Sequence, residues 1–104
     1  MEGNDFVFRK EGATLYVYLG FELSVSNSTA LREMFEAYRG QDFNRIVFDA
    51  TDLVFLSSSG VRVIIFCKKY LSTSSNIVFL NCNDKILDVL DIVGIRPFIT
   101  FEKR

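Results

Sequence analysis

One stretch of this chain, residues 49–71, constrains the fold more than any other. It begins with Asp49 at the end of an apolar run, continues through a second short apolar run, and reaches three consecutive serines followed by Gly60. A nearly all-apolar segment of helical length follows. This order predicts a buried strand, an apolar pass over residues 53–56, a serine turn, and a helix from about Ser59 to Leu71. Hydroxyl groups are therefore expected where a helix begins.

A serine at the start of a helix can have several roles. The first backbone N–H groups of a helix lack internal acceptors, and the helix dipole places partial positive charge there. A serine at that point can cap the helix, bind an anion or carry a phosphate. One of Ser57, Ser58 and Ser59 must start the helix, so capping alone accounts for at least one of them. The turn contains only Gly60 and lacks the lysine of a P-loop, which argues against a phosphate cradle.

The segments before this stretch alternate between strand and helix patterns. Residues 6–10 and 13–19 are β-rich and flank a short break with a glycine, which is typical of a hairpin. Residues 20–24 break the second strand and lead into residues 26–29, a cluster of residue types that cap helices. A helix is predicted to follow and to end at Gly40. Its core-facing stripe has helical spacing and consists of Leu31, Met34, Phe35 and Tyr38.

The remaining segments continue the alternation. Residues 45–49 and 76–82 have the continuous apolar pattern of strands buried on both faces. Asn83 and Asp84 are predicted to cap a third helix that ends at Gly94, and residues 97–101 predict a short last strand. Helices thus connect successive strands. The chain is predicted to be a single α/β domain over residues 1–104, with a mixed sheet of about four to five strands and helices as crossovers.

Composition excludes several classes of function. The chain has no histidine, which removes Ser-His-Asp and Cys-His catalysis and His-ligated zinc. We therefore expect no enzyme activity, no metal and no cofactor. A net charge of −1 without a basic stripe argues against nucleic-acid binding, and no apolar run approaches the length of a membrane span. The N-terminus is acidic and polar, unlike a signal peptide, and Cys67 and Cys82 are interpreted as buried free thiols, so a cytoplasmic location is expected.

The helix after the serine turn has two predicted faces. At about 100° per residue, one face is apolar and points toward the sheet. The opposite face, in line with Ser58, combines two apolar and two basic residues: Val61, Arg62, Ile65 and Lys69. An exposed strip of this kind marks a candidate interaction surface. The alternative, that a loop or the third helix covers Val61 and Ile65, stays open.

The pattern of residues 46–61 resembles the signature of the STAS domain, and in particular of the bacterial anti-sigma factor antagonists. That family typically has a buried strand ending in aspartate, a short apolar pass, the sequence Asp-Ser-(Ser/Ala)-Gly, and an apolar helix. Residues 20–24, Gly-Phe-Glu-Leu-Ser, resemble the family's Gly-x-Leu-Asp with one residue of slippage. Residues 93–95, Val-Gly-Ile, resemble the end of its last helix. The resemblance covers nearly the whole chain.

The resemblance implies a mechanism of regulation. In that family, the unphosphorylated antagonist binds an anti-sigma factor, usually a serine kinase, and releases the sigma factor. The kinase then phosphorylates the antagonist and the complex dissociates, and a serine phosphatase resets it. By position Ser58 is the implied phosphoacceptor, with Ser57 as the alternative. The implied partner contacts are Ser24, Asn27, Ser57, Ser59, Gly60, Val61, Arg62, Ile65 and Lys69, and the free protein is expected to be a monomer.

This chain departs from the family pattern at two positions. Ser57 and Ser24 stand where the family has aspartate, so hydroxyls replace both carboxylates near the acceptor. The replacement makes Ser57 a candidate for the helix cap or for a competing acceptor. A second interpretation follows from the same resemblance, because single STAS domains also resemble the small cytosolic subunit of bacterial lipid-transport ABC systems. In that role the domain braces the ATPase and Ser58 is never modified.

Overall fold

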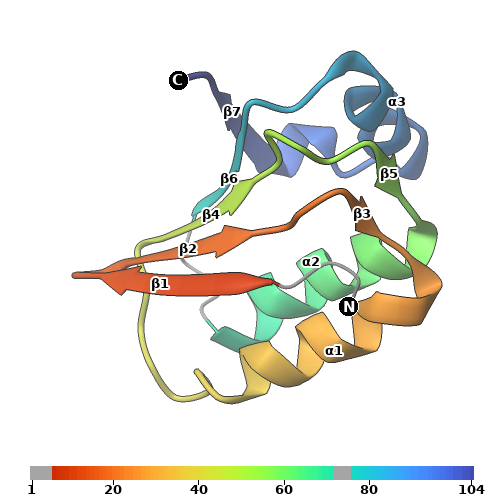
Figure 1. The fold of residues 1–104 in the computed structure, drawn as a ribbon. Coiled ribbons are helices and arrows are strands. Elements are labelled where there is room, and N and C mark those ends of the chain that lie inside the picture. Colours follow the sequence, from red (N-terminus) through yellow and green to blue (C-terminus); the bar gives the residue numbers. More distant parts are fainter. Residues whose placement is uncertain (1–5, 72–75) are drawn as a thin grey trace.

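A five-stranded mixed sheet forms the centre of the molecule (Figure 1). The computed structural model describes residues 6–71 and 76–104, with side chains for all of these except residues 68–71. The strand order is β1-β2-β4-β6-β7, where β1 pairs antiparallel with β2 and every other neighbouring pair is parallel. The strands are β1 (Val7–Glu11), β2 (Thr14–Tyr18), β4 (Arg45–Asp49), β6 (Asn76–Leu80) and β7 (Ile99–Glu102). The predicted mixed α/β fold is confirmed.

A second, two-stranded sheet lies apart from the first. It consists of β3 (Glu22–Leu23) and β5 (Phe55–Leu56), which pair in parallel. The sequence interpretation of residues 20–24 as a simple break was wrong, because this segment contains β3. A strand of two residues shows no periodicity, and only its pairing with a segment about 30 residues away defines it.

Three helices and one 3₁₀ turn complete the fold: α1 (Val25–Glu36), α2 (Ser58–Leu71), α3 (Asp84–Val93) and η1 (Arg96–Phe98). The prediction for α3 is confirmed, since the Asn83 side chain accepts a hydrogen bond from the Ile86 N–H at 3.0 Å and Gly94 adopts the left-handed conformation. The predicted bounds of α1 were wrong at both ends. It begins directly after Ser24, so residues 26–29 lie inside its first turns, and it ends at Glu36, four residues before Gly40, with Ala37 as its cap.

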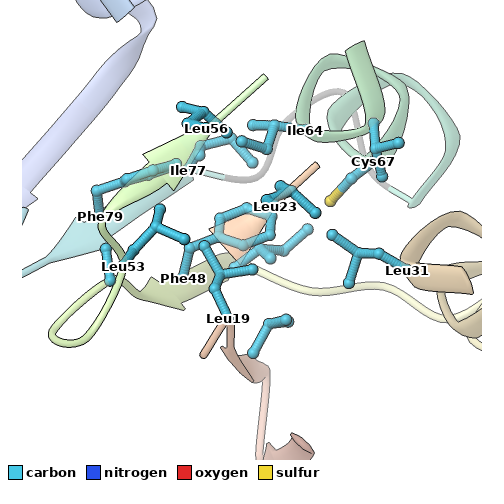
Figure 2. Packing of buried hydrophobic residues seen from close by; sticks show 14 of the residues in the cluster. Leu19, Leu23, Leu31, Phe48, Leu53, Leu56, Ile64, Cys67, Ile77 and Phe79 are labelled. Carbon is cyan, nitrogen blue, oxygen red and sulfur yellow. The ribbon is translucent and has the colours of Figure 1, made fainter. Parts of the chain in front are cut away.

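The core lies between one face of the main sheet and the helices. Alternate residues of β2, β4 and β6 point to this face and are fully buried, among them Val17, Phe48 and Phe79. Figure 2 shows how Leu23 of β3 lies close to Leu31 of α1 and to side chains of α2 in the same cluster. The small sheet is therefore joined to the core through one leucine from each strand, Leu23 of β3 and Leu56 of β5.

The two cysteines are free thiols, as predicted. Cys67 on α2 is fully buried in the core, whereas Cys82 after β6 is half-buried. Burial raises the pKa of the Cys82 thiol to about 11, although the nearby Arg96 guanidinium acts in the opposite direction. The thiol is thus held in its neutral form over the physiological pH range.

We expect alkylation of Cys82 by iodoacetamide to be slow in the folded protein. A pKa of about 11 in place of about 9 lowers the reactive thiolate fraction near pH 8 about 100-fold. Mass spectrometry of the Cys82 peptide should show a rate that rises about tenfold per pH unit toward pH 11, with the urea-unfolded chain as control. Because the folded state favours the neutral thiol, its contribution to stability is complete below about pH 9 and is lost as the pH rises toward 11. A rate that levels off by pH 9 would contradict this.

Candidate functional site

The small sheet places the starts of α1 and α2 side by side. Leu23 and Leu56 are register partners in the parallel β3–β5 pair, so the residues that follow them, Ser24 and Ser57, occupy equivalent positions. The Ser57 N–H donates to the Leu23 carbonyl at 2.9 Å, which continues this pairing to the point where the helices begin. Both helices therefore start at the same end of the molecule, at the right in Figure 1.

The serines that replace the family aspartates are the residues that precede these two helices. The Ser57 hydroxyl accepts a hydrogen bond from the Gly60 N–H at 3.0 Å and thereby caps α2. At α1, the Ser24 N–H donates to Asn27 Oδ1 at 2.7 Å, and the Asn27 side-chain amide donates to the Glu22 carbonyl at 3.0 Å. Asn27 thus joins β3 to the first turn of α1.

Ser58 is the first residue of α2 and is exposed, whereas Ser57 and Ser59 are partly buried. In the described part of the chain, the backbone N–H groups of Ser58 and Ser59 have no acceptor, as expected in the first turn of a helix. The first turn also contains no acidic residue. An anion on the Ser58 hydroxyl would therefore lie at the positive end of the α2 dipole.

Four exposed apolar side chains lie at the same end of the molecule as Ser58. The exposed fractions are 64% for Phe21, 70% for Val25, 62% for Val54 and 52% for Phe55. The Phe21 carbonyl accepts from the N–H groups of Val54 and Phe55, and Val25 is the first residue of α1 as Ser58 is of α2. We call Phe21, Val25, Val54 and Phe55 the apolar rim. Clustered large apolar side chains in water are typical of a protein-binding surface.

The sequence analysis missed the apolar rim. It interpreted residues 53–56 as a continuous apolar pass, but only Leu53 and Leu56 are buried. The available signal was the isolation of Phe21 and Val25 among polar or glycine neighbours, outside any helical or strand pattern. Because β3 and β5 form a separate narrow sheet, only one side of each strand has the core to pack against.

Hydrogen bonds hold the loop that carries Val54 in place. The Tyr18 hydroxyl donates to Asp52 Oδ2 at 2.6 Å, and the Asn83 side-chain amide donates to the Leu53 carbonyl at 2.8 Å. The bond to Asp52 is the main reason that the pKa of Tyr18 lies above its usual value of 10, with burial and nearby carboxylate charge adding to it. The Val54 N–H in turn donates to the Phe21 carbonyl at 2.8 Å. The apolar rim is thus fixed before any partner binds.

The predicted outer face of α2 is only partly correct. Val61 is 1% exposed, so its expected exposure was wrong and the alternative that it is covered is confirmed. α2 packs on α1, on α3 and on Leu23 of β3, and it also contributes residues to the core, so side chains on more than one face of the helix are buried. Arg62 is exposed and Ile65 is 38% exposed, in line with Ser58 as predicted. The side chain of Lys69 lies outside the described residues.

Residues suited to metal binding do not cluster in the described part of the chain. Among residues 6–67 and 76–104, no group of three histidine, cysteine, aspartate or glutamate side chains is positioned to hold a metal ion. In the same part of the chain, no helix has both the length and the apolar character needed to cross a membrane.

Comparisons with known proteins agree with this architecture. The fold is similar to that of the anti-sigma factor antagonist SpoIIAA in its unphosphorylated form, with a TM-score of 0.79, 20% identity, and coverage of 93% of this chain and 87% of that chain. The fold is also similar to that of the Bacillus cell fate determinant SpoIIAA in its phosphorylated form, with a TM-score of 0.71 and 20% identity. That match covers 93% of this chain and 90% of that chain. An anti-sigma factor antagonist from Mycobacterium paratuberculosis has a similar fold, with a TM-score of 0.80 and 13% identity. That match covers 94% of this chain and 84% of that chain.

At these identities the solved structures establish a shared fold. No curated protein sequence matches the chain significantly. A family model described as the STAS domain, however, matches residues 6–104, which is nearly the whole chain. This protein therefore belongs to the STAS domain family.

Proposed function

We propose that this STAS domain is an anti-sigma factor antagonist that acts by partner switching. When Ser58 is unmodified, the domain binds an anti-sigma factor serine kinase and so frees a sigma factor for transcription. Phosphorylation of Ser58 dissociates the complex, and a serine phosphatase restores the binding form. We place this protein in the cytoplasm, as a free monomer without catalytic activity. One observation carries the proposal: the exposed Ser58 hydroxyl stands at a helix start beside the apolar rim.

The apolar rim supplies the binding surface in this proposal. Its side chains are exposed, and hydrogen bonds hold the backbone of the loop that carries Val54, so binding requires little ordering of that backbone. Ile65 extends the apolar area along α2. Val61 is withdrawn as a contact because it is buried. Gly60 is withdrawn for the same reason, because it is buried against Leu23. The other predicted contacts stand with the apolar rim as proposed partner residues: Ser24, Asn27, Ser57, Ser59, Arg62, Ile65 and Lys69.

Phosphorylation at this position would act through charge. A phosphoryl group on Ser58 adds about −1.5 to −2 charges at neutral pH. The positive end of the α2 dipole tolerates that charge within the domain. Inside an apolar interface the same charge would lose its water, and pairing with Arg62, one turn along α2, would offset only part of that cost. Binding can therefore be abolished with no change in the fold of the domain.

The structures of SpoIIAA support the assignment of a phosphorylation switch to this fold. SpoIIAA is an anti-sigma factor antagonist that has been solved in unphosphorylated and phosphorylated forms. Ser57 is less suited to be the acceptor here, because its hydroxyl is partly buried and caps α2. Ser58 has no such role among the described contacts.

The direct test is intact-mass analysis of the protein purified from its own cells, with fragmentation across residues 54–68. A single phosphate on Ser58 is expected in part of the population. Phosphate on Ser57 would move the switch by one residue. If no phosphate is found on this fragment under growth or stress conditions, the proposal is contradicted and the alternative role, a constitutive transporter subunit, is favoured.

The apolar rim is expected to carry most of the binding energy. The double variant Phe21→Ser with Val54→Ser should weaken binding to the anti-sigma factor kinase at least about tenfold, because both side chains become buried in the proposed complex. Titration calorimetry against the anti-sigma factor kinases of the source organism measures this directly.

The matched control for the rim variant is Ile92→Ser at the end of α3. Ile92 is 86% exposed, so its replacement removes a comparable exposed apolar side chain outside the apolar rim. Both variants should unfold within about 2 °C of the unmodified protein, since neither removes core contacts. Equal affinity of the rim variant and the Ile92 variant would refute the proposed surface.

A further inference from the structure

A shallow cavity of about 380 Å³, wide open to solvent, lies between α1 and α2, next to the serine turn. Ser58 is not among the residues that line it. The polar and aromatic side chains in its lining are Ser28, Thr29, Arg32, Ser59, Arg62 and Phe66. Its volume falls within the range of about 300–1,000 Å³ that small-molecule sites have. This cavity is therefore distinct from the apolar rim and has its own chemistry.

The two arginines in the cavity differ from other arginines of the chain. Arg9, Arg39, Arg45 and Arg96 each form an ion pair with a carboxylate. Among the described residues, neither Arg32 nor Arg62 has a carboxylate partner, and no acidic residue lines the cavity. Two arginines thus line one cavity without a carboxylate partner among the described residues. An anion is the ligand that this arrangement favours.

One of the guanidinium groups is already oriented. The Cζ atom of Arg32 lies 4.5 Å from the centroid of the Phe66 ring, in a cation–π contact. Stacking occupies the flat face of a guanidinium group and leaves the N–H donors at its edge available. Those edge donors match the oxygen atoms of a phosphate in bidentate geometry. Because this contact already restrains the Arg32 side chain, less side-chain entropy is lost when an anion binds.

Hydroxyl groups complete the lining. Ser28 is the one buried polar side chain in the described part of the chain, with 5% exposure. Its hydroxyl donates to the Val25 carbonyl at 3.3 Å and keeps its own lone pairs as acceptors. The Thr29 and Ser59 hydroxyls add further donors and acceptors. The cavity thus offers cationic groups for an anion and neutral polar groups for a hydroxylated remainder.

We propose that this cavity binds a small phosphate monoester. Arg32 and Arg62 hold the phosphoryl group, whose two negative charges match the two guanidinium charges. The hydroxyls of Thr29 and Ser59 bind the polar remainder of the molecule. A hollow between two helices admits a small molecule more readily than a folded partner, whose contact surface is large and nearly flat. The proposal does not depend on phosphorylation of Ser58.

The test is a titration of the ¹⁵N-labelled protein with glycerol 3-phosphate, followed by NMR at constant ionic strength. Saturable shifts are expected for the backbone amides of Thr29, Arg32, Ser59 and Arg62. Arg32→Gln and Arg62→Gln should each weaken binding about tenfold or more, because each removes one charge-assisted pair. Arg9→Gln is the matched control, since it removes an exposed arginine that is paired with Glu11 and lies outside the cavity. It should bind as the unmodified protein does.

Inorganic phosphate serves as the second probe. It should saturate the same amides with an affinity at least about tenfold weaker, because it lacks the remainder that reaches the hydroxyls. Equal affinity for the two probes would overturn the monoester proposal and leave a simple anion site. Shifts that rise linearly without saturation, or arginine variants that bind as Arg9→Gln does, would overturn the site itself. Both arginines are exposed, and thermal unfolding of each variant checks that it is folded.

Discussion

Ser58→Asp is expected to weaken binding to the anti-sigma factor kinase at least about 100-fold, a loss of about 2.7 kcal/mol. The carboxylate would lie beside the apolar rim, where the partner displaces water from it without supplying a cation. The same substitution should leave the stability of the free domain unchanged or raise it by about 0.3–1 kcal/mol, because the carboxylate stands in the first turn of α2. Binding and stability thus respond in opposite directions.

Ser58→Asn is the matched control, because asparagine has the size of aspartate and no charge. It should retain affinity within about tenfold of the unmodified protein, since a neutral amide at the interface costs less than an ion. Calorimetric titration gives the affinities, and urea unfolding gives the stabilities. Equal loss of binding in the two variants would show that size at position 58, and not charge, controls the complex. A marked loss of stability in Ser58→Asp would contradict the exposed position of Ser58.

The order of the main elements could be predicted from the sequence because strong local signals define them. The strand of residues 45–49 has three consecutive apolar residues at its centre, and α3 has both an Asn83 cap and a Gly94 stop. Each signal depends on neighbours within a few residues, and tertiary contacts did not override it. The mixed sheet could be predicted because a hairpin makes two strands antiparallel and helical crossovers make the remaining strands parallel.

The candidate site could be predicted only in part, since it depends on contacts distant in sequence. The position of Ser58 followed from the serine turn, but the burial of Val61 depends on how α2 lies against its neighbours. The apolar rim depends on the pairing of β3 with β5, two strands too short to have a pattern. A helical wheel describes a helix with one buried side, whereas α2 contacts α1, α3 and Leu23 of β3.

Leu23→Ala is expected to lower the free energy of unfolding by about 2–5 kcal/mol, because Leu23 is fully buried and joins the small sheet to the core. Gly60→Ala should also destabilise the domain. A Cβ atom at Gly60 would lie 2.6 Å from Leu23 Cγ and 3.0 Å from the Leu23 carbonyl oxygen. We expect a cost of about 1–2 kcal/mol, since overpacking outweighs the gain of about 1 kcal/mol in helix propensity.

The double variant distinguishes this packing from two independent effects. Leu23→Ala removes the Cγ and Cδ2 atoms that a Cβ at Gly60 would meet, so Gly60→Ala should cost about 1–2 kcal/mol less in that background. Urea unfolding of the four proteins measures the coupling, and Leu23→Ala combined with Ile92→Ala is the additive control. Strict additivity would show that α2 is not held against β3 at Gly60. Coupling would mean that the contact which stabilises the small sheet also sets the position of Ser58, two residues before Gly60, relative to the apolar rim.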